Sequence, residues 1–177
     1  MQKIVFKAEI ININNLHIIQ IPILISQKLP SRGIVMVEGE IHRTSLKTVL
    51  EPDGKGSHIW KIEKDLLKKL DIHAGDEIIV ELHESENWIE PEIPNDMGRA
   101  LVNDKTANKI WNQITPLSRW DWMRWISSTN NPDTRRRRIE VACSKLASNK
   151  RRPCCFDKTK CTDVSISKNG VLHLLAS

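Results

Sequence analysis

The sequence lacks a hydrophobic run long enough to cross a bilayer. Its longest apolar stretch, residues 16–25, is interrupted by His17, Gln20 and Pro22, whereas a membrane-spanning helix needs about 20 consecutive apolar residues. The first residues enter a strand pattern directly and lack the basic and apolar regions of a signal peptide. We therefore expect a cytoplasmic protein with no membrane partner.

Catalytic motifs are also missing. The six histidines are scattered, and none is spaced from a serine or cysteine as in a hydrolytic site. The turn at residues 53–56 has only two glycines and is too short to cradle a phosphate. Asp76 follows Gly75, a position that suits the fixing of a turn better than acid–base chemistry. These absences predict a non-enzymatic protein that requires no cofactor.

The four cysteines do not form a metal-binding motif. They are Cys143, Cys154, Cys155 and Cys161, and no pair has the CxxC spacing that commonly supplies two zinc ligands from one loop. Cys154, Cys155 and Cys161 are the candidates for a metal site, with Cys143 or His173 as a fourth ligand. Adjacent cysteines point apart in an extended chain, however, so we expect no metal. Basic neighbours could instead make one thiol reactive by lowering its pKa, or the cysteines could have no chemical role.

The charge of the chain is divided unevenly. The 177 residues are 40% hydrophobic and 28% charged, as in a soluble globular protein, and the net charge is +5. Residues 1–93 carry 11 Lys and Arg against 15 Asp and Glu, whereas residues 94–177 carry 16 against 7. The acidic and basic halves could attract each other, or the basic half could bind an external polyanion. The first alternative needs no outside partner.

The acidic half has the pattern of a small β-structure. Ile4, Phe6, Ala8 and Ile10 alternate with polar residues and predict a strand with one buried face. Further strands are expected over residues 16–21, 33–41, 42–50, 57–62 and 77–83, with turns between them and a short helix over residues 66–70. This pattern predicts a small barrel or sandwich over residues 1–90.

The period becomes helical after an acidic, proline-containing linker over residues 84–94. Helices are expected from Asn95 or Asp96 and over residues 107–114, where Pro116 ends the second one. Ser118 and Asp121 resemble a capping box for the next helix.

The helical pattern defines a domain over residues 91–152. The remaining segment, residues 153–177, is a basic tail that contains cysteines. A hairpin is expected in it around Asn169-Gly170, because this dipeptide favours the tight turn between two strands. The whole pattern predicts an α+β protein with two domains and a tail.

Four consecutive arginines, residues 135–138, open the last predicted helix. Asp133 or Thr134 could cap it, and Ile139, Ala142, Cys143 and Leu146 form its apolar face. At about 100° per residue, Arg135 lies on the apolar side, Arg136 and Arg138 at its edges and Arg137 opposite. The first turn of a helix prefers anions, so something acidic should face these arginines.

Two interpretations of the arginines remain open. They could contact the phosphates of a nucleic acid, since Lys and Arg carry most of that affinity. The candidate residues are then Arg135, Arg136, Arg137, Arg138, Arg124 and Trp120, with Trp88 as a further aromatic contact. Alternatively, Arg135 and Arg138 pair with carboxylates of the acidic barrel while the other two are solvated, which is the commoner fate of charge runs. The other tryptophans, Trp111, Trp122 and Trp125, are expected in the core.

Two groups of motifs resemble known bacterial domains. The first group comprises Arg32-Gly33, Asp53-Gly54-Lys55-Gly56 and Ala74-Gly75-Asp76-Glu77-Ile78-Ile79-Val80. The second comprises Pro94-Asn95-Asp96, Ser118-Arg119, Trp125-Ile126 and Thr134-Arg135-x-x-Arg138-Ile139. The first group resembles bacterial domain of unknown function 1905. The second resembles the helical YdeI/OmpD-associated (bacteriocin-protection) domain that follows it.

The resemblance covers roughly residues 3–152. It implies a small antiparallel double-split β-barrel, similar to that of some DNA-binding regulators and antitoxins, followed by a helical C-terminal domain. It implies no established reaction and no catalytic residues. We therefore expect a non-enzymatic binding protein that contacts nucleic acid or another anionic ligand through its basic helical half. The alternative is a small-molecule-binding stress or bacteriocin-protection protein with a pocket between barrel and helices.

Overall fold

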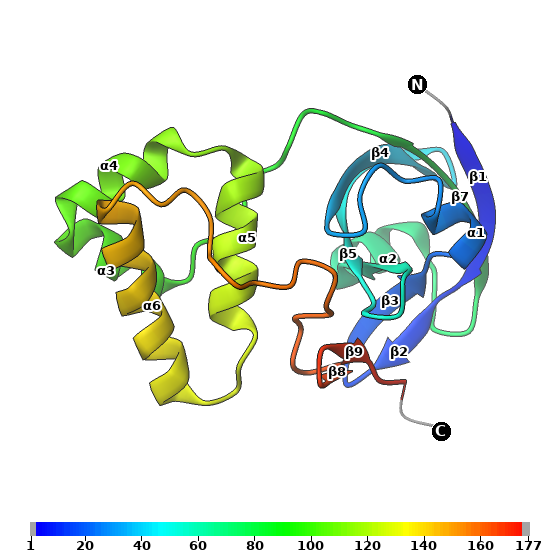
Figure 1. The fold of residues 1–177 in the computed structure, drawn as a ribbon. Coiled ribbons are helices and arrows are strands. Elements are labelled where there is room, and N and C mark those ends of the chain that lie inside the picture. The colour runs from blue at the N-terminus through cyan, green and yellow to red at the C-terminus, as the bar shows by residue number, and fades with distance from the viewer. Residues whose placement is uncertain (1–2, 175–177) are drawn as a thin grey trace. The chain divides into compact units, whose positions relative to one another are not determined.

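The computed structural model describes residues 3–174, which form two compact units (Figure 1). The sheet unit comprises residues 3–87, 158–161 and 165–174, and the helical unit comprises residues 88–157 and 162–164. Strands gather in the first unit and the longer helices in the second, so the predicted α+β class is confirmed. No helix in the described part of the chain is both long and apolar enough to span a membrane.

Seven strands of the sheet unit form one antiparallel sheet. They are β1 (Ile4–Glu9), β2 (Ile11–Ile13), β3 (Leu16–Gln20), β4 (Val35–Ile41), β5 (Thr44–Pro52), β6 (His58–Ile62) and β7 (Glu77–Glu84). Their order across the sheet is β1-β7-β4-β5-β6-β3-β2. β1 and β2 stand at opposite ends of this order, although only Ile10 separates them in the chain. The sheet must therefore curl on itself, as Figure 1 shows.

Alternation along the strands places the core inside the curled sheet. Phe6 of β1, Val37 of β4 and Val80 of β7 are at most 8% exposed and belong to one hydrophobic cluster. Trp60 of β6 joins this cluster, as does Leu67 of the short helix α2 (Lys64–Leu70). A second short helix, α1 (Ile23–Ser26), follows β3. The predicted alternation of apolar and polar residues therefore directs one side of each strand into the core.

The hairpin between β4 and β5 turns at His42 and Arg43. Both have positive φ angles, 47° and 63°, as a two-residue turn of this twist requires. The prediction of a strand over residues 42–50 was wrong at its start, because neither residue is a usual turn former. It was also wrong at its end, since β5 continues to Pro52, which pairs with His58 of β6.

The hairpin expected around Asn169-Gly170 is present. Its strands are β8 (Ser167–Lys168) and β9 (Val171–Leu172), and Asn169 and Gly170 have φ angles of 55° and 77°. Ile166 and Leu172 pack with Ile13, Ile18, Ile59 and Cys161 in a separate cluster of the sheet unit. The terminal hairpin thus packs with β2, β3 and β6 in a second, smaller core of the sheet unit.

The helical unit contains α3 (Asn95–Asn103), α4 (Lys105–Gln113), α5 (Pro116–Ser127) and α6 (Pro132–Ala147). One hydrophobic cluster joins all of them, and its buried members include Met97, Trp111, Trp122 and Ile139. Trp111 and Trp122 are 3% and 1% exposed, so their predicted place in the core is confirmed.

Two helix starts differ from the sequence prediction. Pro116 is the first residue of α5, and Thr115 caps the helix by accepting a hydrogen bond from the backbone N–H of Ser118 at 3.2 Å. The capping box predicted for Ser118 and Asp121 is therefore wrong. At α6, Asn131 is the cap and accepts from Thr134 N at 3.0 Å, with a proline again in the first position. The caps predicted at α6 were two or three residues too late, because proline suits the first helical position.

Gly39 lets β4 and β7 approach each other closely. A β-carbon at this position would lie 1.8 Å from the carbonyl oxygen of Glu81, so the backbone would have to move. We expect Gly39→Ala to lower the free energy of unfolding of the sheet unit by about 2 kcal/mol or more. Urea denaturation followed by circular dichroism would measure this loss.

Gly98→Ala is the matched control for this substitution. Gly98 lies inside α3, and a β-carbon there would meet nothing closer than Ile93 Cγ2 at 4.0 Å. Alanine is a better helix former than glycine, so this variant should gain about 0.5–1 kcal/mol. A Gly39→Ala protein as stable as the original chain would contradict the close approach of the two strands.

Candidate anion-binding site on the helical unit

Arg135 is bound to a carboxylate of its own unit. Its Nε donates to Asp96 Oδ2 at 2.6 Å, its Nη2 donates to Asp96 Oδ1 at 3.0 Å, and its Nη1 donates to Ser127 Oγ at 3.2 Å. The hydrogen bonds from Arg135 lower the pKa of Asp96, and Asp96 in turn raises the pKa of Arg135. Two parallel bonds of this kind are stronger and more specific than a single ion pair.

Arg138 covers the end of α5. Its Nη1 donates to the carbonyl oxygen of Trp125 and to Ser128 Oγ, both at 2.8 Å. The guanidinium carbon also lies 5.5 Å from the centroid of a Trp125 ring, within range of a cation–π interaction. Carbonyls in the last turn of a helix lack partners within the helix, so Arg138 stabilises this terminus.

These contacts correct the internal alternative for the arginines. In that alternative, Arg135 and Arg138 pair with carboxylates of the acidic barrel, but Asp96, Trp125 and Ser128 all belong to the helical unit. The excess of acidic residues in the first half of the sequence suggested that the partners of the arginines would be carboxylates of the barrel. The actual partner, Asp96, is one of the few acidic residues of the basic half.

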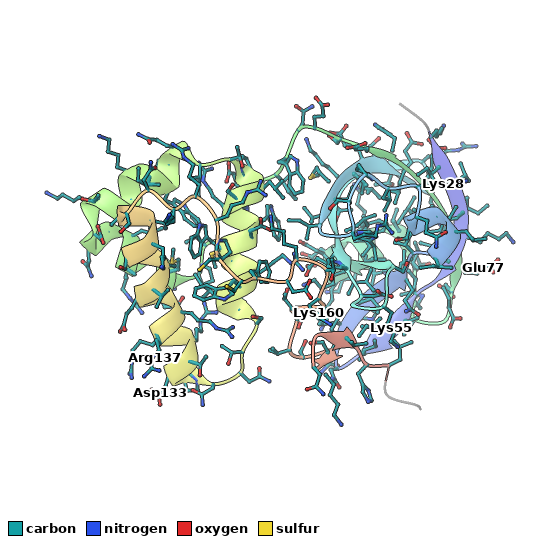
Figure 2. All side chains as sticks on the ribbon, viewed as in Figure 1. Lys28, Lys55, Glu77, Asp133, Arg137 and Lys160 are labelled. Atoms are coloured by element: carbon teal, nitrogen blue, oxygen red, sulfur yellow. The ribbon has the colours of Figure 1, made fainter. Side chains whose placement is uncertain are left out.

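Arg136 and Arg137 remain exposed. Arg136 forms an ion pair of 3.0 Å with Asp133, and the two side chains are 72% and 78% exposed. The side chain of Arg137 makes no hydrogen bond or ion pair with any residue in the described part of the chain. Figure 2 shows Arg137 and Asp133 at the start of α6, with their side chains directed away from the helix. An external anion could therefore reach both arginines.

The other two candidates, Trp120 and Arg124, are half-buried and buried, respectively. Trp120 is half-buried and its Nε1 donates to the carbonyl oxygen of Ile89 at 2.8 Å. Arg124 is only 4% exposed, and its guanidinium carbon lies 5.4 Å from the centroid of the Phe156 ring. Neither residue extends the exposed cationic surface of α6. Trp88 is also half-buried.

Sequence reasoning missed the role of Arg119. Its Nε and Nη2 donate to the carbonyl oxygens of Trp111 and Asn112 at 2.9 and 3.2 Å, and its Nη1 binds Glu90 Oε1 at 2.6 Å. Arg119 therefore stabilises the last turn of α4 by binding its carbonyl oxygens, as Arg138 does for α5. No local pattern indicates this role, because the arginine and the carbonyls belong to different helices.

The candidate metal ligands are not brought together. Cys154 and Cys155 are exposed, whereas Cys161 is buried in the cluster of the sheet unit that contains the terminal hairpin. Cys143 is buried in the helical unit, and this burial raises the pKa of its thiol. Among residues 3–174, no group of three or more His, Cys, Asp and Glu side chains could hold a metal ion.

A shallow hollow of about 550 Å³ lies on the sheet unit, over β4, β5 and β7. Its charged lining residues include Glu38, Glu40, Glu81 and Lys47. Glu38 accepts from Ser85 Oγ at 2.7 Å and pairs with Lys47 at 3.0 Å, and these bonds lower the pKa of Glu38. Carboxylates predominate here, so the hollow does not suit an anionic ligand.

The pair of Asp96 and Arg135 predicts a pH-dependent stability. The pKa of Asp96 is lowered in the folded protein, so its stabilising effect is complete above the pKa of an unfolded aspartate, about 3.9. The effect is lost as the pH falls through the lower pKa of the folded protein. We expect Asp96→Asn to reduce the free energy of unfolding by about 1 kcal/mol at pH 7, and by much less in acid. Denaturant titrations across this pH range would measure the difference, and a constant difference would argue against the pair.

The contrast between Arg138 and Arg137 gives a second prediction. Arg138→Ala removes two hydrogen bonds and an aromatic contact, so it should destabilise the helical unit by about 1–3 kcal/mol. Arg137→Ala removes an exposed side chain and should change stability by less than about 0.5 kcal/mol. Thermal unfolding of both variants would test this order, and equal losses would contradict the assignment.

Comparison with known proteins gives two adjoining matches. A family model described as "Domain of unknown function (DUF1905)" matches residues 6–82. A model described as "Bacteriocin-protection, YdeI or OmpD-Associated" matches residues 90–149. No curated protein matches the chain. The matches have the order that the sequence motifs predicted: the DUF1905 match comes first and the YdeI or OmpD-associated match follows it.

Proposed function

We propose that the helical unit binds a polyanion, with nucleic acid as the preferred class, through Arg136 and Arg137. The observation that carries the proposal is the division of the four arginines. The side chains of Arg135 and Arg138 donate hydrogen bonds within the helical unit, whereas those of Arg136 and Arg137 are exposed. The protein acts by binding and not by catalysis.

The position of the two exposed arginines supports this proposal. Arg136 and Arg137 are the fifth and sixth residues of α6, which begins at Pro132, so they lie in its second turn. Asp133 forms an ion pair with Arg136, but the side chain of Arg137 has no such partner among the described residues. An anion bound there would interact with two guanidinium groups.

The exposed charge of the helical unit as a whole favours a long anion over a single phosphate. The other exposed cations of the helical unit are Arg99, Lys105, Lys109, Lys145, Lys150, Arg151 and Arg152. Its exposed acids are fewer, namely Glu90, Glu92, Asp133, Glu140 and Asp157. Binding to a phosphate backbone gains from many such contacts and weakens as salt rises.

A second proposal rests on the description of the matched helical family, which names bacteriocin protection. In this proposal the protein binds a small molecule and protects the cell through that binding. It predicts that a specific metabolite raises the unfolding temperature and that salt has little effect. The polyanion proposal predicts the opposite dependence on salt.

The test is fluorescence anisotropy with labelled single- and double-stranded DNA and RNA at low and physiological salt. The variant Arg136→Ala/Arg137→Ala should bind at least about tenfold more weakly at low salt. Its slope of log K against log salt should be shallower by about 2, because two phosphate contacts are lost. The fold of the variant would be checked by circular dichroism.

Lys64→Ala/Lys68→Ala provides the matched control. It removes the same charge from exposed positions of α2 in the sheet unit. We expect this variant to bind almost as tightly as the original chain. Equal weakening in both variants would show that binding depends only on the net charge of the chain, which would contradict a site at Arg136 and Arg137. Absence of binding at low salt would refute the polyanion proposal.

A further inference from the structure

Cys154 and Cys155 form a pair of adjacent, exposed thiols that the proposed function does not use. They lie in a turn, and Cys155 has a φ of 57°. A left-handed conformation costs a residue with a β-carbon about 1–2 kcal/mol. The extended backbone that would direct the two side chains apart is therefore absent.

Contacts with α5 hold this turn at both ends. Before it, the carbonyl oxygen of Arg151 accepts a hydrogen bond from Trp122 Nε1 at 3.2 Å, and Pro153 is buried. After it, the Phe156 ring lies under the guanidinium of Arg124 at 5.4 Å. Because the flanking residues are fixed, the thiols stay at the surface in a defined segment.

Two thiols are too few for a structural zinc site, which takes four ligands. The described residues offer no group of three or more side chains that could complete one. A disulfide also suits the pair poorly. Adjacent Cα atoms lie about 3.8 Å apart across a trans peptide, whereas disulfides usually join Cα atoms about 4.4–6.8 Å apart. No peptide bond in the described chain is cis.

We propose that Cys154 and Cys155 together bind a thiophilic centre that takes two sulfur ligands, represented by a monosubstituted trivalent arsenical. In the reaction of R–As=O with the pair, both S–H bonds and the As=O bond break, and two As–S bonds form. The two protons leave with the oxygen as one water, and no atom is oxidised or reduced. The arsenic enters between the sulfurs, so the ring is one atom larger than that of a disulfide.

The probe is phenylarsine oxide, added to the full chain in the presence of excess monothiol. Mass spectrometry of the native protein should show one arsenical per chain, retained against the monothiol and removed by a dithiol. Cys154→Ser and Cys155→Ser should each weaken binding about a hundredfold or more, because the second sulfur no longer acts at high effective concentration. Both residues are exposed, so neither substitution should alter the fold.

Cys143→Ala is the control that removes a buried thiol of the same unit, and it should leave the adduct unchanged. A wild-type chain that forms no adduct, or one that the monothiol removes, would overturn the proposal. An adduct that persists in either single serine variant would overturn it as well, because one sulfur would then suffice.

Discussion

An arginine in the first turn of a helix needs negative charge nearby, because free N–H groups and the macrodipole make that end positive. Asp96 meets this need for Arg135, although it lies 39 positions earlier in the chain. The same carboxylate accepts from Met97 N at 2.8 Å, so it serves the starts of α3 and α6 together. Met97 of α3 and Ile139 of α6 both belong to the hydrophobic cluster of the helical unit. The contact thus fixes the relative position of two helices around one core.

Other arginines of the helical unit also have structural roles. Arg119 and Arg138 bind carbonyl oxygens in the last turns of α4 and α5, and Arg124 packs against Phe156. The positive charge of residues 94–177 therefore overstates the charge that a ligand could reach. Of the four consecutive arginines of α6, only Arg136 and Arg137 are exposed, and this division narrows the proposed contact to the first half of the helix.

Local signals in the sequence predicted much of the fold. The alternation from Ile4 to Ile10 and the Asn169-Gly170 turn act between near neighbours, so they can be recognised without the structure. The partner of Arg135 could not be predicted, because no local pattern links residues so far apart. The interior position of Arg124 was equally hidden. Polar and apolar residues are both buried along α5, which removes the usual contrast between its faces.

The most direct test of this division is hydrogen exchange of the arginine Nε–H groups, observed by NMR in isotope-labelled protein. The Nε–H of Arg135 donates to Asp96 at 2.6 Å and should exchange slowly, whereas those of Arg136 and Arg137 should exchange at rates typical of solvated side chains. Substituting Asp96 by asparagine should accelerate the exchange of Arg135 alone. Exchange at Arg135 as fast as at Arg137 in the original chain would contradict the account.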